Sequence, residues 1–459
     1  MALRWPGSDD PTPGPVWEAD RVLPPLETVS RHRPVHVVQP SAARSLPAGR
    51  HPVGAPAPYV AATLPLTGAE GRLELTGPGL VARAVHDGDA ARLDLEVDGT
   101  RHTLRSRRHA RCRAAEELAL ALTGRHLSVL TRDGAGWTVR ARVDLAEHGV
   151  DPHAVGWSGQ LEASCSTEFV AGRFGQLGLR DVRLVSSADG TPVRDGDHVL
   201  LTATHAGPGF FDTGQTGVWG YDPARDHLVH RGTLWFRRAG DPRVFGDHAT
   251  HLVHDDDAWL VATSTWSDFD LDAPEVHCTL GRSGADLTRG EHVVDTAPLD
   301  LPDAGYRRVG TWDPHLVRVD EEWLVGYVAA TRFFRFHPAL AAGPDLAHLT
   351  HRGAAADRRA TEGTTLLHLD GRWLVGASDG PDGRRGQRRG YPLFDLTMQQ
   401  VGALDAPHPS NIPWPTLLEQ DGRTWLVTFD GTPTGGPVAG YGTHGDLVVA
   451  ASADPGATS

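Results

Sequence analysis

Three carboxylic residues hold comparable places ahead of apolar runs. Asp181 and Asp313 each stand three residues before a leucine that opens such a run, and Glu362 stands four before one. Carboxyl groups gathered in one pocket repel each other's charge and lose hydration, so at least one keeps its proton at neutral pH. A protonated acid beside an ionised carboxylate is the pair that hydrolysis of a glycosidic bond requires. We therefore ask which elements could bring the three together.

The chain repeats one theme after residue 180: an apolar strand, an acidic turn, and a second apolar strand that usually opens with tryptophan. Four copies are clear, "THLVHDDDAWLVATS", "PHLVRVDEEWLVGYV", "TTLLHLDGRWLVGAS" and "PTLLEQDGRTWLVTF", and a looser copy covers 181–207. Apolar runs flanking Asp-Gly or acidic turns are typical of β-hairpins. A repeat of about 40–50 residues with four short strands is typical of a propeller blade.

We therefore predict an all-β fold with a five-bladed β-propeller at 181–459, in which the strand at 445–452 completes the last blade. The innermost strands of a propeller lie beside one axis, so the three acids should converge on a single funnel. The repeated tryptophans, recurring at a structural position, are predicted to pack between blades. The competing interpretation is a β-sandwich whose hairpins resemble one another by chance.

The segment before the repeats has a different rhythm. Residues 55–180 alternate strand-like runs with polar turns, which predicts an antiparallel β-sandwich, of jelly-roll or concanavalin-like texture. The first 54 residues, rich in Pro and Arg, are predicted to be an extended arm. The expected domains are 1–54, 55–180 and 181–459.

Composition excludes several classes. A formal net charge of −14 with interspersed charges argues against nucleic-acid binding. Three cysteines that match neither a disulfide framework nor a metal motif are predicted to be buried apolar residues. The N-terminus lacks the apolar region of a signal peptide and no window is long enough to span a membrane. We expect a cytoplasmic protein without membrane contact, although a trimmed secreted chain would look the same.

Two blade motifs carry a resemblance. "TWDPHLVRVDEEWLV" at 311–325 and "TEGTTLLHLDGRWLV" at 361–375 resemble the Asp-Pro and Glu-Gly motifs of glycoside hydrolase family 43 and its five-bladed relatives. The resemblance covers the propeller, a little under two thirds of the chain, and its motifs are short. It implies hydrolysis of furanosides, in particular arabinofuranosides, with inversion. Glu362 would be the general acid, Asp313 the residue that tunes and orients it, and Asp181 the general base.

The chain departs from the family pattern at Asp181, which no proline follows. If Asp181 only closes the sandwich, the base would be Asp247 or Asp212. Arg180 before it resembles the Arg-Asp motif of the family 32 fructosidases, which leaves open a retaining fructofuranosidase or transglycosidase, although the nucleophile motif of that family is missing. A propeller that only binds glycans is the third alternative.

Further residues are candidates for holding a carbohydrate substrate. Trp312 and Trp414 lie outside the repeated tryptophan register and could stack on a sugar face, while His248, His315 and Asp247 could form hydrogen bonds. No cofactor is expected and no catalytic metal site is predicted, because the histidines are dispersed. The resemblance also allows a structural calcium ion in the axial channel. The Gly- and Arg-rich segment 379–392 could clamp an anionic or polyhydroxylated substrate or be a solvated loop.

Overall fold

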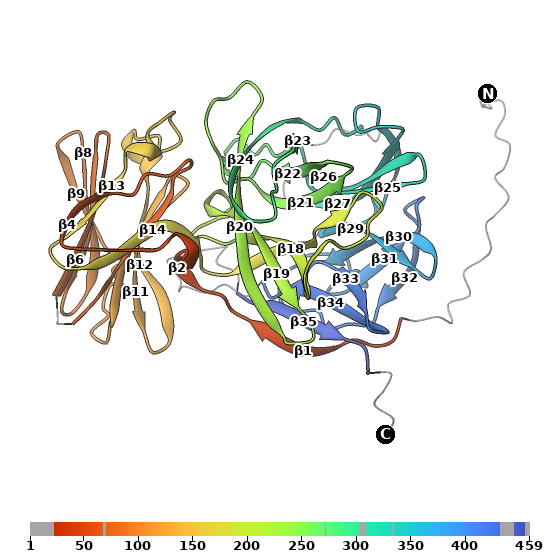
Figure 1. Cartoon of the computed structure of the whole chain (residues 1–459), viewed down its shortest axis with the longest axis horizontal. Coiled ribbons are helices and arrows are strands. Elements are labelled where there is room, and N and C mark those ends of the chain that lie inside the picture. Colours follow the sequence, from red (N-terminus) through yellow and green to blue (C-terminus); the bar gives the residue numbers. More distant parts are fainter. Residues whose placement is uncertain are drawn as a thin grey trace.

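The N-terminal half folds as two β-sheets packed face to face (Figure 1). The computed structural model describes residues 23–67, 70–270, 272–302, 309–332, 335–431 and 445–454. One sheet has the order β12 (Gly136–Asp144), β11 (His126–Asp133), β10 (Glu117–Thr123), β5 (Tyr59–Pro65), β14 (Phe169–Gln176), β2 (His36–Val38), with β3 (Arg44–Leu46) beside β14. The other has the order β4 (Gly49–Pro52), β13 (Glu162–Cys165), β6 (Glu70–Gly77), β7 (Leu80–Asp87), β8 (Ala91–Val97), β9 (Thr100–Leu104).

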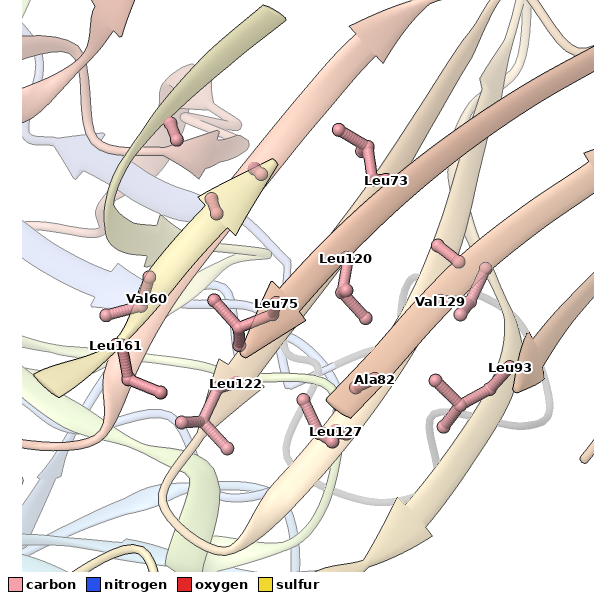
Figure 2. Packing of buried hydrophobic residues seen from close by; sticks show 14 of the residues in the cluster. Val60, Leu73, Leu75, Ala82, Leu93, Leu120, Leu122, Leu127, Val129 and Leu161 are labelled. Carbon is pink, nitrogen blue, oxygen red and sulfur yellow. The ribbon is translucent and has the colours of Figure 1, made fainter. Parts of the chain in front are cut away.

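The core between these sheets follows from residue alternation. Successive residues of β7 and β8 alternate between buried and partly exposed, as expected for strands that turn one face to a core. Leu73, Leu93 and Leu120 meet there with other aliphatic side chains of both sheets, as Figure 2 shows. Burying one such leucine contributes about 2 kcal/mol. The segment thus consists of two β-sheets around one core, and its classification as a β-sandwich of jelly-roll or concanavalin-like connectivity stays a prediction.

Strand β10 is buried on both faces, and its sequence explains why. In "ELALALT" the leucines join the core between the two sheets, whereas Ala119 and Ala121 join a second cluster with Trp235 of the propeller. The small side chains of Ala119 and Ala121 let this sheet approach the large buried ring of Trp235. Tyr59 lies in the same cluster, with its ring centre 5.1 Å from that of Trp235. The two-sheet unit is therefore packed directly against the propeller.

Five blades of four strands form the C-terminal part of the described chain. They are β15 (Leu179–Leu184), β18 (His198–His205), β19 (Gln215–Asp222), β20 (His227–Arg238); β21 (His248–Asp255), β22 (Ala258–Ser264), β23 (Cys278–Ser283), β24 (Gly290–Pro298); β25 (Gly310–Val319), β26 (Glu322–Arg332), β27 (Arg335–Gly343), β28 (Thr350–Ala354); β29 (Thr361–Leu369), β30 (Arg372–Asp379), β31 (Tyr391–Phe394), β32 (Gln400–Leu404); and β33 (Thr416–Gln420), β34 (Arg423–Phe429), β35 (Leu447–Ala451), β1 (Glu27–His32). The five-bladed propeller expected from the repeats is confirmed.

Connections between blades complete the architecture. The outer strands β20 and β24 pair in parallel, which joins the first two blades into one sheet. That sheet also contains β16 (Ser186–Ser187) and β17 (Arg194–Asp195). Short 3-10 helices lie in connections: η1 (Pro40–Ala42), η2 (Leu145–His148), η3 (Ser158–Gln160) and η4 (Phe211–Thr213). Among the described residues no helix reaches the length and apolarity that crossing a bilayer would demand.

Of the segment 1–54, predicted as an extended arm, residues 1–22 lie outside the described residues, and the described remainder is instead built into both sheet systems. β1 pairs antiparallel with β35 and forms the outer strand of the fifth blade, whereas β2, β3 and β4 join the two sheets of the sandwich. Figure 1 shows β1 running beside β35 beneath the propeller. The strands are short and the segments between them are rich in Pro, so the local sequence carries little β signal. Pairing partners more than 100 residues away supply what local propensity lacks.

A β-bulge recurs at the start of four inner strands. The pairing register shifts after Arg180, His248, Trp312 and Glu362, one in each of the first four blades. The next residue has a left-handed backbone in every case, with φ of 53° at Asp181, 59° at Ala249, 56° at Asp313 and 69° at Gly363. Asp and Gly tolerate this conformation better than most residues. The bulge re-aims the side chains at the entrance of the axial channel.

Candidate active site

A cavity of about 250 Å³ opens at the bulged ends of the inner strands. Asp181, Asp313 and Glu362 all line it, so the structure brings together the three acids singled out in the sequence. Its walls are mainly aromatic and apolar: Phe210, Phe211, Trp266, Trp312, Phe336, Ile412, Trp414 and Phe429. Flat apolar walls around a few carboxyls suit a sugar ring, which presents C–H faces and a polar edge.

Asp181 is held between Arg180 and His248. Its Oδ2 lies 3.2 Å from Nε of Arg180 and 3.7 Å from Nδ1 of His248. Burial raises the pKa of Asp181, while the charges of Arg180 and Arg183 and a hydrogen bond with Thr204 oppose that rise. A contact with a guanidinium favours the ionised form. Asp181 is thus the carboxyl in the cavity with the closest positive charge.

Asp313 is almost completely buried, with 2% of its surface exposed. Its Oδ2 accepts a hydrogen bond from the backbone N–H of Gly363 at 3.1 Å, and its own N–H donates to Oγ of Ser264 at 3.0 Å. Burial and the charge of Asp181 raise the pKa of Asp313 to about 8, against the opposing charge of Arg183. Asp313 therefore joins the third and fourth blades and holds a proton over most of the neutral range.

Glu362 sits beside Asp313 in the site and is partly buried. Burial and the negative charges of Asp313 and Asp181 raise the pKa of Glu362 well above its ordinary value, and a hydrogen bond with Trp312 opposes the rise. A carboxyl kept protonated near neutral pH can donate a proton to a leaving oxygen. The electrostatics thus separate Glu362, which keeps its proton, from Asp181, which is the easiest of the three to ionise.

A buried arginine lies beneath the acids. Arg183 is completely buried; its Nη2 donates to the carbonyl of Asp313 at 2.8 Å and its Nη1 to Oγ1 of Thr365 at 3.2 Å. Its guanidinium stacks 4.4 Å from the ring centre of Trp414. Burial lowers the pKa of Arg183 to about 10, so the group stays charged at neutral pH. Sequence analysis missed it, although it stands two residues after Asp181 in the same bulged strand.

Two histidines occupy the equivalent place in the next two blades. His251 and His315 stack with ring centres 4.0 Å apart and an interplanar angle of 9°. Nδ1 of His251 accepts the N–H of Leu316 at 3.0 Å, and Nδ1 of His315 accepts that of Leu366 at 3.3 Å. Burial lowers the pKa of both rings well below the usual value. The rings are neutral connectors between successive inner strands.

His315 and Asp247, predicted to hold substrate, lie elsewhere. His315 does not line the cavity of the acids, because the bulge at Asp313 turns it toward the interior of the channel. Asp247 is fully buried and forms two bonds with Arg238, at 2.6 and 2.9 Å. The alternative base Asp212 is bound to His126 at 2.8 Å. Neither aspartate lines the cavity, whereas His248, Trp312 and Trp414 do.

Several lining residues were missed by sequence reasoning. Counting three residues back from the apolar run finds Asp181 and Asp313 but in the fourth blade it reaches Gly363, one residue beyond Glu362. The structure explains this shift, since the positions just before the bulge, Arg180, His248, Trp312 and Glu362, also line the cavity. A second count, one residue further back, would have identified Arg180. The wall residues from connecting loops carry no comparable signal.

One of those walls is held by the N-terminal sheets. Phe210 and Phe211 belong to the loop between β18 and β19, whose Asp212 accepts from Nε2 of His126 and lies 3.3 Å from Nε of Arg125. Tyr59 donates its hydroxyl to the carbonyl of Gly214 at 2.7 Å. The sandwich thus anchors the middle and the C-terminal end of the short 3-10 helix that carries a wall of the cavity.

The axial channel does not fit the calcium ion that the resemblance allows. Calcium prefers six to eight oxygen ligands, mostly carboxylates and carbonyls. The channel interior instead holds the guanidinium of Arg183 and the two stacked imidazoles, whose Nδ1 atoms already accept backbone N–H groups. Within the described ranges no group of three or more His, Cys, Asp or Glu side chains could hold a metal ion. No step of the chemistry is assigned to a metal.

No protein-family model and no curated protein matches the chain. Solved structures do resemble it. A family 32 β-fructofuranosidase of Bombyx mori is 16% identical with a TM-score of 0.41, and the match covers 59% of each chain. A family 117 glycoside hydrolase of Zobellia galactanivorans is 11% identical, TM-score 0.45, over 60% of this chain and 84% of that one. A family 43 β-xylosidase/α-arabinofuranosidase from a compost metagenome is 13% identical, TM-score 0.37, over 60% and 93%.

Proposed function

We propose that the chain is a glycoside hydrolase that cleaves furanosidic linkages, in the manner of an arabinofuranosidase, with inversion of configuration. The observation that carries the proposal is the meeting of Asp181, Asp313 and Glu362, from three different blades, in one aromatic cavity. A fold that buries three carboxyls together accepts a large electrostatic cost, and such costs are concentrated at sites of chemistry. The choice of furanosides rests on the blade motifs that resemble family 43.

Binding would place one sugar ring between the aromatic walls, with the bond to be cleaved beside Glu362. Trp312 and Trp414 offer faces for stacking on the ring, and His248 and Arg180 border the same cavity. Nη1 of Arg180, on a side chain with 3% exposure, has no hydrogen-bond partner in the described residues. That N–H is suited to a sugar hydroxyl, because a buried donor left unpaired is costly.

Cleavage would proceed in one displacement. Glu362 transfers its proton to the leaving oxygen as the bond to the anomeric carbon breaks. Asp181 takes a proton from a water molecule whose oxygen bonds to that carbon from the opposite face. Burial keeps Glu362 protonated, and Asp313 orients the segment that carries Glu362 by accepting the N–H of Gly363. Proton exchange with solvent restores both carboxyls.

The test is hydrolysis of a panel of aryl arabinofuranosides, fructofuranosides and pyranosides by the wild type and by Glu362→Gln. Release of the aryl alcohol from an arabinofuranoside by the wild type, lost in the variant, is the expected result. A wild type that cleaves no member of the panel would refute the proposal and favour a propeller that only binds glycans.

A second candidate is the retaining chemistry of the fructofuranosidases. The contact between Arg180 and Asp181 favours it, because the resembling Arg-Asp motif belongs to family 32. Nuclear magnetic resonance of the first-formed sugar distinguishes the two: inversion supports our proposal, whereas retention would make Asp181 a nucleophile.

A further inference from the structure

The loop between β30 and β31 forms part of the cavity rim and is well anchored. Pro381 and Asp382 line the cavity. The N–H of Arg389 donates to the carbonyl of Asp379 at 2.8 Å, and Nε2 of Gln387 donates to Asp357 at 2.8 Å. The loop therefore presents its side chains to solvent from a defined backbone beside the proposed active site.

Exposed arginines gather on this loop and its neighbours. Arg359 directly precedes Ala360, and Arg335 directly precedes Phe336, both of which line the cavity. Strand pairing puts the segments at the same end of the third and fourth blades, because Thr361 pairs with Asp379 at the bulged end. We call the exposed set the arginine rim: Arg335, Arg359, Arg384, Arg385, Arg388 and Arg389.

The rim is not neutralised by acids. In the part of the chain that the structure describes, none of its six side chains forms an ion pair. The same loops carry only Asp357 and Asp382 near them. By contrast, the corresponding loop of the second blade carries Asp268, Asp270, Asp272 and Glu275. In a chain of net charge −14, the mouth of the cavity thus has one basic side.

Concentrated unpaired arginines have a specific chemical complement. The guanidinium fork matches carboxylate and sulfate oxygens in two-bond geometry. Clustered like charges raise the local concentration of the opposite ion and speed its association. The rim lies outside the aromatic cavity that holds the acids, so ring binding takes place inside the cavity and anion binding outside it.

We propose that the arginine rim binds an anionic group, a carboxylate or a sulfate, on the portion of a saccharide that lies outside the cavity. The inference names the substrate class of the proposed hydrolase and rests on that function. The ring that enters the cavity is uncharged, and the sugar next to it carries the anion.

The test measures binding separately from hydrolysis. Native gel electrophoresis of the full chain is run through gels containing polygalacturonate, dextran sulfate or uncharged dextran. The wild type should be retarded by at least one polyanion and not by dextran, and retardation should vanish in about 0.5 M NaCl, where charges are screened. The polyanion that retards it identifies carboxylate or sulfate as the ligand.

A matched pair of triple variants locates the binding. Arg359→Gln, Arg384→Gln and Arg385→Gln together remove three rim charges whose side chains make no bond that the fold needs. Arg105→Gln, Arg107→Gln and Arg108→Gln remove three exposed charges from the sandwich. The rim variant should bind the polyanion about tenfold more weakly, as expected for several exposed ion pairs, and the sandwich variant within about twofold of the wild type.

The outcomes separate the two proposals. A wild type that neither polyanion retards overturns the rim inference, and so does an equal loss in both triple variants, which would mean diffuse attraction. Retardation that depends on the rim supports it whether or not any sugar is released. If the wild type binds through the rim but cleaves no member of the glycoside panel, the hydrolase proposal fails and the anion site stands.

Discussion

Nη2 of Arg183 in the first blade donates to the backbone carbonyl of Asp313 in the third blade, at 2.8 Å. The bond crosses the axis of the propeller and puts a positive charge directly under the carboxyls. Because Arg183 lowers the pKa values of Asp181 and Asp313, it favours an ionised carboxyl in a site that burial would otherwise keep protonated. The pH dependence of activity should therefore report on this residue.

Replacing Arg183 should shift the acidic limb of activity. Arg183→Gln removes a charge that lowers the pKa of Asp181, so this base should ionise only at higher pH. The midpoint of the acidic limb of the kcat/KM profile should therefore move to higher pH by roughly one pH unit. Arg183→Lys should restore part of the shift. The measurement is the pH profile of kcat/KM for the wild type and the folded variants. A loss of rate that is equal at every pH, with the acidic limb unmoved, would indicate only a structural role for Arg183.

Glu362→Gln should lower kcat by about 10²–10⁴-fold, the usual contribution of a general acid. The loss should be smallest for aryl glycosides whose leaving group needs no protonation, which steady-state kinetics on a leaving-group series can measure. Glu322→Gln is the matched control, since Glu322 pairs with Arg352 on an exposed hairpin. Equal losses for good and poor leaving groups would contradict the assignment.

Asp313→Asn should stabilise the protein increasingly as pH rises. The folded pKa of Asp313 is about 8, above that of an unfolded aspartate, so the folded state holds a proton that the unfolded state has released. The stability that this bound proton gives the wild type is therefore fully present below pH 4. Between pH 4 and about 8 the free energy of unfolding falls by about 1.4 kcal/mol per pH unit for this one group. The amide oxygen can still accept the N–H of Gly363.

Thermal unfolding of both proteins between pH 4 and pH 8 tests this expectation. The midpoint of the variant should exceed that of the wild type at the upper end and converge with it near pH 4. A variant that is less stable at every pH would show that the carboxyl contributes more through its hydrogen bond than it costs through burial.

Loosening the sandwich contact should weaken substrate binding. Asp212→Asn removes the charge that His126 and Arg125 hold, so the wall of Phe210 and Phe211 should lose its fixed position. We expect KM to rise severalfold with a smaller change in kcat, measured on the best substrate of the panel. Glu117→Gln, which breaks an exposed pair with Arg132, is the control and should leave KM unchanged. Unchanged KM in Asp212→Asn would mean that the wall is held by other contacts.

The sequence predicts the propeller well because each blade repeats the same hairpin, and Asp181 and Asp313 stand at the same distance from the apolar run that follows them. The sequence predicts the position of a side chain less well where its partners come from strands far away in the chain. Asp247 stands five residues before Leu252, close to the spacing of the three acids, but a neighbouring strand brings Arg238 to it. His315 precedes the apolar run, yet the extra residue of the bulge turns its ring into the channel. Such outcomes depend on partners from other elements.

The arm illustrates the same limit, because its residues have neither strong β propensity nor alternation. Arg31 and Arg33 of β1 and the loop after it nevertheless pair with Asp446, which precedes β35. These ion pairs with the buried Asp446, together with the backbone hydrogen bonds to β35, hold β1 as an outer strand that its own sequence does not predict.

The closure of the fifth blade by β1 also sets a condition on synthesis. Residues 27–32 leave the ribosome long before their partners at 447–451. Four blades can assemble while translation continues, but the ring stays open until residues 447–451 have emerged. A ribosome that stalls anywhere before that point releases a product with an uncovered strand edge, the kind of edge that invites aggregation.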